Sequence, residues 1–135
     1  MSILIDTNVF LWAAGVDGRL SDDAVEFLAA PDVPVFFSSA SAWEIAIKWS
    51  KGRLTLPERP ETMIDKLISA SGFTRLSISF RDAYAVSDLP NFPDHKDPFD
   101  RLIVAQAKGN GLRLMTSDSR LEKYGVEVLF CNRKK

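Results

Sequence analysis

The sequence predicts a three-layer α/β/α fold around a mostly parallel five-stranded sheet. Short apolar segments alternate with segments of helical periodicity along the whole chain, which is typical of strand–helix–strand units. Several apolar segments lack the polar alternation of a strand with one wet face, so the sheet is expected to be covered by helices on both sides. The length of 135 residues, with 46% hydrophobic and 26% charged residues, predicts one domain over residues 1–135 with a single core.

Strands and helices are expected in a regular order. The predicted strands are residues 3–5, 34–37, 74–78, 112–116 and 126–130. The predicted helices are residues 9–14, 21–30, 39–51, 60–71, 80–89, 98–108 and 119–124. Boundary residues support this division, since Ser21 is a favourable N-cap and Pro98 favours a first helical turn. Gly15, Gly52 and Gly72 follow three of the helices, where glycine commonly ends a helix.

Charge and composition exclude several classes of protein. Seventeen basic residues against 18 acidic ones give a net charge of −1, which excludes a strongly basic DNA-coating protein. The single cysteine, Cys131, excludes an intramolecular disulfide framework and is typical of a reducing compartment. The start of the chain lacks the basic region of a signal peptide, and no apolar run approaches the roughly 20 residues that span a bilayer. We therefore expect a soluble, cytoplasmic protein that does not act on a membrane.

Two carboxylates directly follow predicted strands. Asp6 comes after residues 3–5, and Asp118 comes two residues after the strand at 112–116. Each has an ordinary structural interpretation as a turn residue or helix cap. Ligands of parallel α/β sheets bind beyond the carboxyl ends of the strands, so the same positions also favour a functional site.

Three further acids lie at the starts of predicted helices. Glu44 stands three residues after Ser41, which is the spacing of a capping box. Asp97 precedes Pro98 as a predicted N-cap, and Asp100 falls at the third helical position, where the helix dipole favours an acid. Taken singly, these acids also have a sufficient structural explanation.

The acids are more informative as a set. A parallel sheet would bring at least Asp6, Glu44 and Asp118 to one edge, and the loop at 90–97 would have to return Asp100 to the same edge. Carboxylates about 5 Å apart repel by roughly 3 kcal/mol per pair at an effective dielectric of about 20. Such a group requires raised pKa values or a bound cation. Oxygen ligands alone favour Mg²⁺ or Mn²⁺.

The remaining charges are compatible with nucleic acid as substrate. Without the four acids Asp6, Glu44, Asp100 and Asp118, 14 acidic residues remain against 17 basic ones, a net charge of +3 around an acidic pocket. The candidates for contact with an RNA backbone, each of which has ordinary surface charge as an alternative, are Lys48, Lys51, Arg53, Arg101, Lys108, Arg113 and Arg120. We expect Arg101, beside Asp100, to be the most important of them.

Hydroxyl and amide groups flank the acids. The candidates for binding substrate or a metal-bound water are Thr7, Asn8, Ser38, Ser39, Thr116 and Ser117, all of which are also common turn and cap residues. The only histidine, His95, is predicted to lie in a loop near the mouth of the pocket, with a phosphate contact as the lesser alternative.

Four segments together resemble the PIN-domain ribonucleases, and most closely the VapC-type toxins of toxin–antitoxin pairs. They are residues 5–8, 41–46, 97–107 and 116–118, and the resemblance extends over essentially the whole chain. It implies a five-stranded parallel sheet and Mg²⁺- or Mn²⁺-dependent cleavage of RNA. The acidic quartet of the family falls on Asp6, Glu44, Asp100 and Asp118. Asp97 corresponds to an additional acid, which we expect to be an occasional metal ligand, and Thr116 to a hydroxyl near the site.

The resemblance also implies products and partners. Attack by a metal-activated water would leave 5′-phosphate and 3′-hydroxyl ends. A cognate antitoxin would bind across an apolar groove, and a homodimer would pack through the middle helices at residues 60–89. Trp43 and Trp49 lie on different faces of one short helix, which independently favours an exposed apolar surface.

Other functions remain as alternatives. A non-catalytic PIN-like module for RNA binding or scaffolding predicts loss of a quartet acid, and all four are present. A haloacid-dehalogenase-type phosphatase needs a second acid at position 8, which is Asn8. A receiver domain needs a lysine at the end of the strand at 112–116, where the sequence has Thr116 and Ser117. A flap nuclease shares related chemistry, but the chain is short for one.

Overall fold

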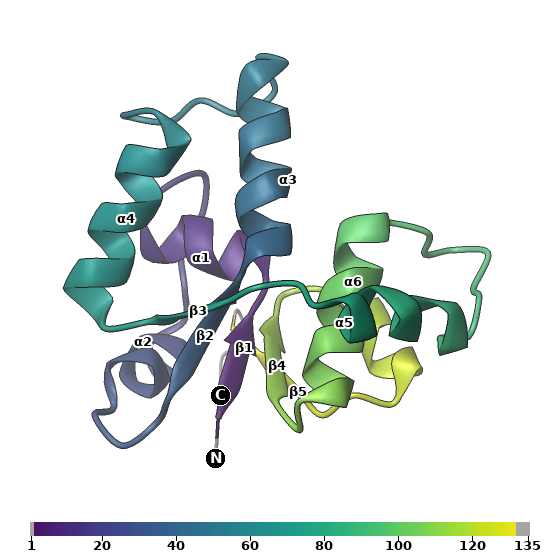
Figure 1. The fold of residues 1–135 in the computed structure, drawn as a ribbon. Helices are drawn as coiled ribbons and strands as arrows, with labels where there is room; N and C mark the ends of the chain where they lie inside the picture. Colours follow the sequence, from purple (N-terminus) through teal and green to yellow (C-terminus); the bar gives the residue numbers. More distant parts are fainter. Residues whose placement is uncertain (1, 132–135) are drawn as a thin grey trace.

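The computed structural model describes residues 2–131 and contains a parallel five-stranded sheet between two layers of helices (Figure 1). The strands are β1 (Ile3–Ile5), β2 (Val35–Ser38), β3 (Thr74–Leu76), β4 (Arg113–Thr116) and β5 (Val128–Phe130). Their order across the sheet is β3-β2-β1-β4-β5, and every neighbouring pair is parallel. The predicted α/β/α fold is therefore confirmed, with a sheet that is parallel throughout.

The helices follow the predicted order with small changes at their ends. They are α1 (Thr7–Ala13), α2 (Asp22–Ala29), α3 (Ser39–Ser50), α4 (Pro60–Ser71), α5 (Phe80–Ala85), η1 (Val86–Asp88), α6 (Pro98–Gly109) and η2 (Ser119–Tyr124). The single helix predicted at 80–89 is wrong in detail, because it divides into α5 and the 3₁₀ turn η1. Within residues 2–131, no helix has both the length and the apolar character needed to cross a bilayer.

The pleat of β1 distributes the core between the two faces of the sheet. Ile3 and Ile5 point into a cluster formed with α1, α2 and α4, whereas Leu4 points into the opposite cluster with α6 and η2. All three side chains are fully buried. This alternation with a period of two is the property of a central strand covered on both sides.

The strand order creates a switch point beside β1. The chain runs from β1 to β2 and β3 on one side and then returns to form β4 on the other. Connections that leave neighbouring strands in opposite directions open a crevice at their carboxyl ends. Asp6 follows β1 and Asp118 follows β4, so both acids lie at the edge of the sheet formed by the carboxyl ends of the strands, beside this switch point.

The start of α3 corrects the predicted capping box. The N-cap is Ser38, whose hydroxyl accepts a hydrogen bond from the Ala40 amide at 3.0 Å. Ser41 is consequently the third residue of the helix rather than its N-cap, so the proposed capping box between Ser41 and Glu44 is wrong. Their side chains are free to point toward Thr7 at the start of α1 instead.

Candidate metal centre

Asp6 is a buried carboxylate held in a fixed orientation. Its Oδ1 accepts a hydrogen bond from the Val9 amide at 2.9 Å, which confirms the predicted helix cap, and its Oδ2 accepts one from the Thr116 hydroxyl. Burial raises the pKa of Asp6 to about 7 against these two hydrogen bonds, and the negative charges of Asp100 and Glu44 raise it further. None of the ion pairs within residues 2–131 involves Asp6.

Glu44 is joined to Asp6 through the neighbouring threonine. The Thr7 hydroxyl lies 2.5 Å from Glu44 Oε1 and 3.0 Å from Ser41 Oγ. The other carboxylate oxygen, Oε2, accepts from Lys48 Nζ at 2.6 Å, one helical turn further along α3. Glu44 is therefore buried, but it has a cation as a partner.

Asp97 and Asp100 begin α6 at the same edge of the sheet. The Oδ1 atom of Asp97 accepts from the Phe99 and Asp100 amides at 2.9 and 3.1 Å, so the predicted N-cap is confirmed. Burial and the negative charge of Asp97 raise the pKa of Asp100 to about 6, and the hydrogen bond from His95 opposes the shift. The segment at 90–97 thus returns the start of α6 to the other acids, as the sequence required.

Asp118 follows β4 and is paired with an arginine. Arg120 donates to its two carboxylate oxygens from Nε at 3.0 Å and Nη2 at 2.8 Å, and these bonds hold the pKa of Asp118 below its usual range. The Asp118 amide donates to Thr116 Oγ1 at 3.0 Å. Because the Thr116 hydroxyl donates to Asp6, it links the ends of the two adjacent strands.

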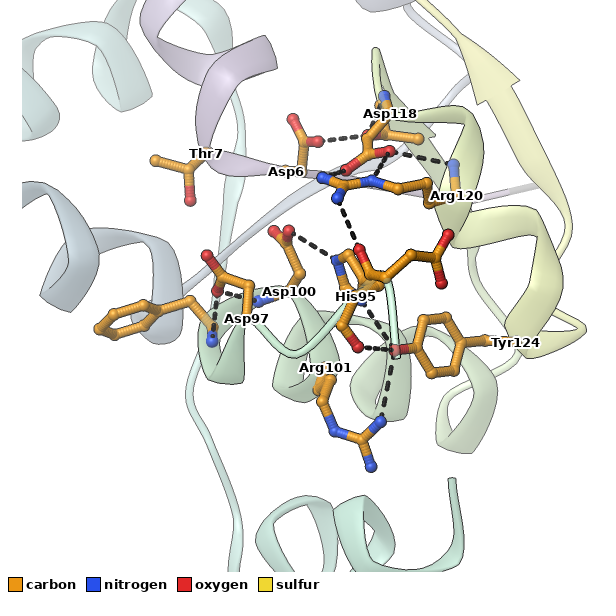
Figure 2. Close-up of polar contacts among 12 residues, drawn as sticks. Asp6, Thr7, His95, Asp97, Asp100, Arg101, Asp118, Arg120 and Tyr124 are labelled. Atoms are coloured by element: carbon orange, nitrogen blue, oxygen red, sulfur yellow. Dashed lines mark hydrogen bonds and ion pairs between the residues drawn. The ribbon is translucent and has the colours of Figure 1, made fainter. Parts of the chain in front are cut away.

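A histidine belongs to the same polar cluster, and Figure 2 shows it beside Asp6, Asp97, Asp100 and Asp118. One ligand atom each of His95, Asp100 and Asp118 lies within 4.8 Å of the other two. Asp6 and Asp100 each interact electrostatically with Glu44, which connects the remaining two acids to this group. A set rich in carboxylate oxygens with buried negative charge fits a hard divalent cation.

The other predicted site residues have mixed positions. Arg101 points away from the carboxylates, toward Tyr124 and the carbonyl oxygens of Pro90 and Val86 (Figure 2). The Ser39 hydroxyl accepts from the Ile78 amide. These bonds give Arg101 and Ser39 structural roles, and a contact of either with RNA stays a prediction.

Asn8 and Ser117 are less constrained. Asn8 is exposed and Ser117 is half-buried, and within residues 2–131 no hydrogen bond joins either side chain to the acids. Their predicted contacts with substrate also stay predictions.

His95 is more central than the sequence indicated. It was expected to lie in a loop near the pocket mouth; it does belong to the connection between η1 and α6, but only 2% of its surface is exposed. Its position five residues before Asp100 was a weak signal for a role at the site. Tyr124, which contacts His95 from η2, had no signal in the sequence, because 29 residues separate the two side chains.

Comparisons with known proteins agree with this architecture. The profile of the PIN domain matches residues 3–127. VapBC2 from Rickettsia felis, solved with a promoter DNA fragment, has a TM-score of 0.75 at 16% identity, covering 98% of this chain and 100% of that chain. DNA-bound VapBC from Salmonella typhimurium gives 0.67 at 16% identity, covering 96% and 98% respectively.

A toxin–antitoxin complex from Klebsiella pneumoniae is also similar. Its TM-score is 0.64 at 22% identity, with coverage of 94% of this chain and 95% of that chain. No curated protein matches the chain. At these identities the solved structures support the fold.

Proposed function

Because the chain belongs to the PIN-domain family, we propose that it is a divalent-metal-dependent endoribonuclease and the toxin of a toxin–antitoxin pair. The observation that carries this proposal is the environment of Asp6. A carboxylate that is 5% exposed lies beside two other acids, and burial and their charges raise its pKa. Folding would not gather these groups for stability alone, since buried like charges are unfavourable.

The cation would be held by the acidic quartet. The residues proposed to hold Mg²⁺ or Mn²⁺ are Asp6, Glu44, Asp100 and Asp118, with Asp97 as an additional acid. When bound, the metal supplies an activated water and neutralises charge at the leaving oxygen. Thr7 and Thr116 would orient the carboxylates through the hydrogen bonds described above. Hydrolysis by water would leave 5′-phosphate and 3′-hydroxyl ends on the RNA.

Protein partners are also part of the proposal. The similar structures named above include complexes of a toxin with an antitoxin, which supports a cognate antitoxin for this chain. Large exposed side chains support partner surfaces, since Trp43 is 56% exposed on α3. Phe80 and Tyr84 are also exposed and lie within residues 60–89, the segment expected to form a homodimer. We place this activity in the cytoplasm, as one nuclease domain.

Cleavage of RNA by the wild-type protein tests the proposed reaction. Purified protein should cut an RNA substrate with Mn²⁺ or Mg²⁺, and a chelator or Asp6→Asn should abolish cutting. The matched control is Asp32→Asn, which changes an exposed acid in the turn before β2. End-group analysis should find 5′-phosphates, whereas 2′,3′-cyclic phosphates would contradict attack by water. Equal activity of wild type and Asp6→Asn would end the nuclease proposal and favour a non-catalytic module.

A further inference from the structure

His95 is a buried side chain of the cluster with a polar partner on each ring nitrogen. Its Nε2 atom lies 3.2 Å from Asp100 Oδ2, and its Nδ1 atom lies 2.7 Å from the Tyr124 hydroxyl (Figure 2). An isolated antiparallel bridge between Phe92 and His95 shapes the loop that carries the ring. The imidazole is therefore fixed between a tyrosine of η2 and a carboxylate of α6.

The carboxylate beside His95 indicates which atoms donate. Asp100 Oδ2 is an acceptor, so Nε2 donates to it, and the other nitrogen of a neutral imidazole, Nδ1, accepts from the Tyr124 hydroxyl at 2.7 Å. The Tyr124 hydroxyl also lies 3.4 Å from the His95 carbonyl oxygen, a longer contact with a second acceptor. The same hydroxyl oxygen accepts from Arg101 Nη1 at 3.3 Å, and proximity to a cation makes the hydroxyl a stronger donor. A neutral imidazole that accepts at Nδ1 carries its proton on Nε2, where it donates to Asp100.

We propose that His95 is a positioning residue, and that the hydrogen-bond chain Arg101–Tyr124–His95 fixes the orientation of the Asp100 carboxylate that would hold the metal. This inference rests on the proposed metal site. It also gives Arg101 a role at the site through Tyr124 and His95. Asp100 needs such support because its neighbour in the first turn of α6 is another acid, Asp97, whose charge repels it.

Direct coordination by His95 is the competing arrangement. A separation of 3.2 Å between Nε2 and Oδ2 is also compatible with two adjacent ligands of one ion. Coordination would require a free lone pair on Nε2, and the proton assignment above places a hydrogen there. Positioning and direct coordination thus differ in whether Nε2 of His95 carries a proton. Substitution of His95 and spectroscopy of the bound metal can therefore distinguish them.

Binding of Mn²⁺ to the folded protein, without RNA, tests the positioning role. His95→Asn removes the Nε2 donor and should weaken Mn²⁺ binding about 10- to 100-fold, the usual loss when a residue that orients a metal ligand is removed. His95→Gln retains an amide N–H near the Nε2 position and should recover most of this affinity. Tyr124→Phe keeps the ring but loses the hydroxyl, and should give an intermediate loss.

Val126→Ala is the matched control for packing. Val126 is a buried aliphatic residue of the same core cluster as Tyr124, and its side chain cannot form a hydrogen bond. Val126→Ala should lower thermal stability while the Mn²⁺ dissociation constant stays within twofold of wild type. A merely structural His95 would instead give affinities that follow the thermal stabilities of all four variants, and that result would overturn the proposal.

Spectroscopy completes the test. Electron spin-echo measurements on the wild-type Mn²⁺ complex should show no directly bound ¹⁴N. A strong nitrogen coupling in wild type that is lost in both His95→Asn and His95→Gln would establish His95 as a metal ligand and refute the positioning role. Failure of the wild type to bind Mn²⁺ would contradict the proposed function itself. Normal Mn²⁺ binding by His95→Asn would contradict only the positioning role.

Discussion

The four quartet acids form two pairs that differ in how their charge is stabilised. Asp6 and Asp100, which we call the desolvated acids, have raised pKa values because burial and neighbouring carboxylates disfavour their ionised forms. Glu44 and Asp118, which we call the ion-paired acids, each contact a basic side chain, at 2.6 Å and 2.8 Å respectively. A divalent cation would therefore contribute most to the desolvated acids, where the folded protein supplies the least compensating charge.

This difference separates two tasks within one cluster. The side chains of the desolvated acids are mostly buried, whereas the bases of the ion-paired acids are about half exposed and can exchange partners with solvent or phosphate. We expect substitution of a desolvated acid to remove function and substitution of a paired base to adjust it.

Loss of a desolvated acid should nearly abolish catalysis. Asp100→Asn should lower kcat/KM for RNA by roughly 10³-fold, because a bound metal typically supplies several kcal/mol of transition-state stabilisation. Lys48→Met, at a paired base, should change kcat/KM by less than tenfold. Steady-state cleavage of one RNA by both variants provides the comparison. Equal losses would show that the two pairs do not differ in function.

The metal-free protein should lose stability as the pH rises. Asp6 has a pKa of about 7 in the folded protein, above the ordinary aspartate value of 3.8, so between these pH values the folded state binds the proton more tightly than the unfolded state does. The free energy of unfolding should therefore fall between about pH 4 and pH 7. For Asp6 the fall is at most about 4 kcal/mol at 1.36 kcal/mol per pKa unit.

Asp6→Asn isolates this contribution. In a chelator, urea denaturation at pH 8 should show Asp6→Asn to be more stable than wild type, with a smaller difference at pH 5. Asp32→Asn should follow wild type at both pH values. If Asp6→Asn were no more stable than wild type at pH 8, burial of the ionised Asp6 carboxylate would not be destabilising, which would contradict the prediction.

Metal binding should restore the stability that the metal-free protein loses as the pH rises. Mn²⁺ at 100 times its dissociation constant adds about 2.7 kcal/mol to stability. The increase in Tm should be greater at pH 8 than at pH 5 for the same Mn²⁺ concentration, since protons compete for the desolvated acids. Differential scanning fluorimetry with Mn²⁺ and with chelator measures both shifts. An equal shift at the two pH values would indicate binding elsewhere.

Substitution of Arg120 should change the affinity for Mn²⁺ only slightly. Arg120→Gln removes the cation from Asp118 and should tighten Mn²⁺ binding by at most about fivefold, because half-exposed ion pairs contribute little. Calorimetric titration of the variant without RNA measures the change. Weaker binding in Arg120→Gln would show that the guanidinium orients Asp118 for the metal and does not compete with it.

The smallest effect is expected for the stability contributed by Lys48. Its pair with Glu44 is an i,i+4 contact on one helix between a half-exposed lysine and a buried glutamate, so we expect it to contribute about 1 kcal/mol, the upper end of the range for exposed pairs. Lys48→Met should therefore change the free energy of unfolding by no more than this amount in urea denaturation. A loss of several kcal/mol would move Glu44 into the class of the desolvated acids.

The sequence predicted features that depend on local pattern. The apolar run at residues 3–5 predicted the buried strand β1, and Asp6 after it predicted both a helix cap and a position at the sheet edge. The capping box at Ser41 failed because Ser38, at the end of β2, competes for the same helix start. Choosing between two serines three residues apart requires knowing where the strand ends, and sequence pattern fixes such ends poorly.

The environment of the histidine could not be predicted in this way. His95 and Tyr124 are distant in the chain and meet only because η2 packs against the segment before α6. A loop histidine is usually exposed, and no spacing rule relates it to a tyrosine 29 residues away. Contacts of this kind depend on tertiary packing, which single-sequence patterns do not contain.

Because Asp6 belongs both to the acidic cluster and to the cap of α1, a backbone signal can report on the proposed metal site. The same carboxylate that lies in the acidic cluster also accepts the Val9 amide proton at 2.9 Å. Any change in the charge of Asp6 will shift the nuclear magnetic resonance of that amide, as hydrogen bonds to carboxylates respond to ionisation. Titration with a diamagnetic ion such as Mg²⁺ would then report occupancy from a backbone signal in α1, without RNA, turnover or an engineered label.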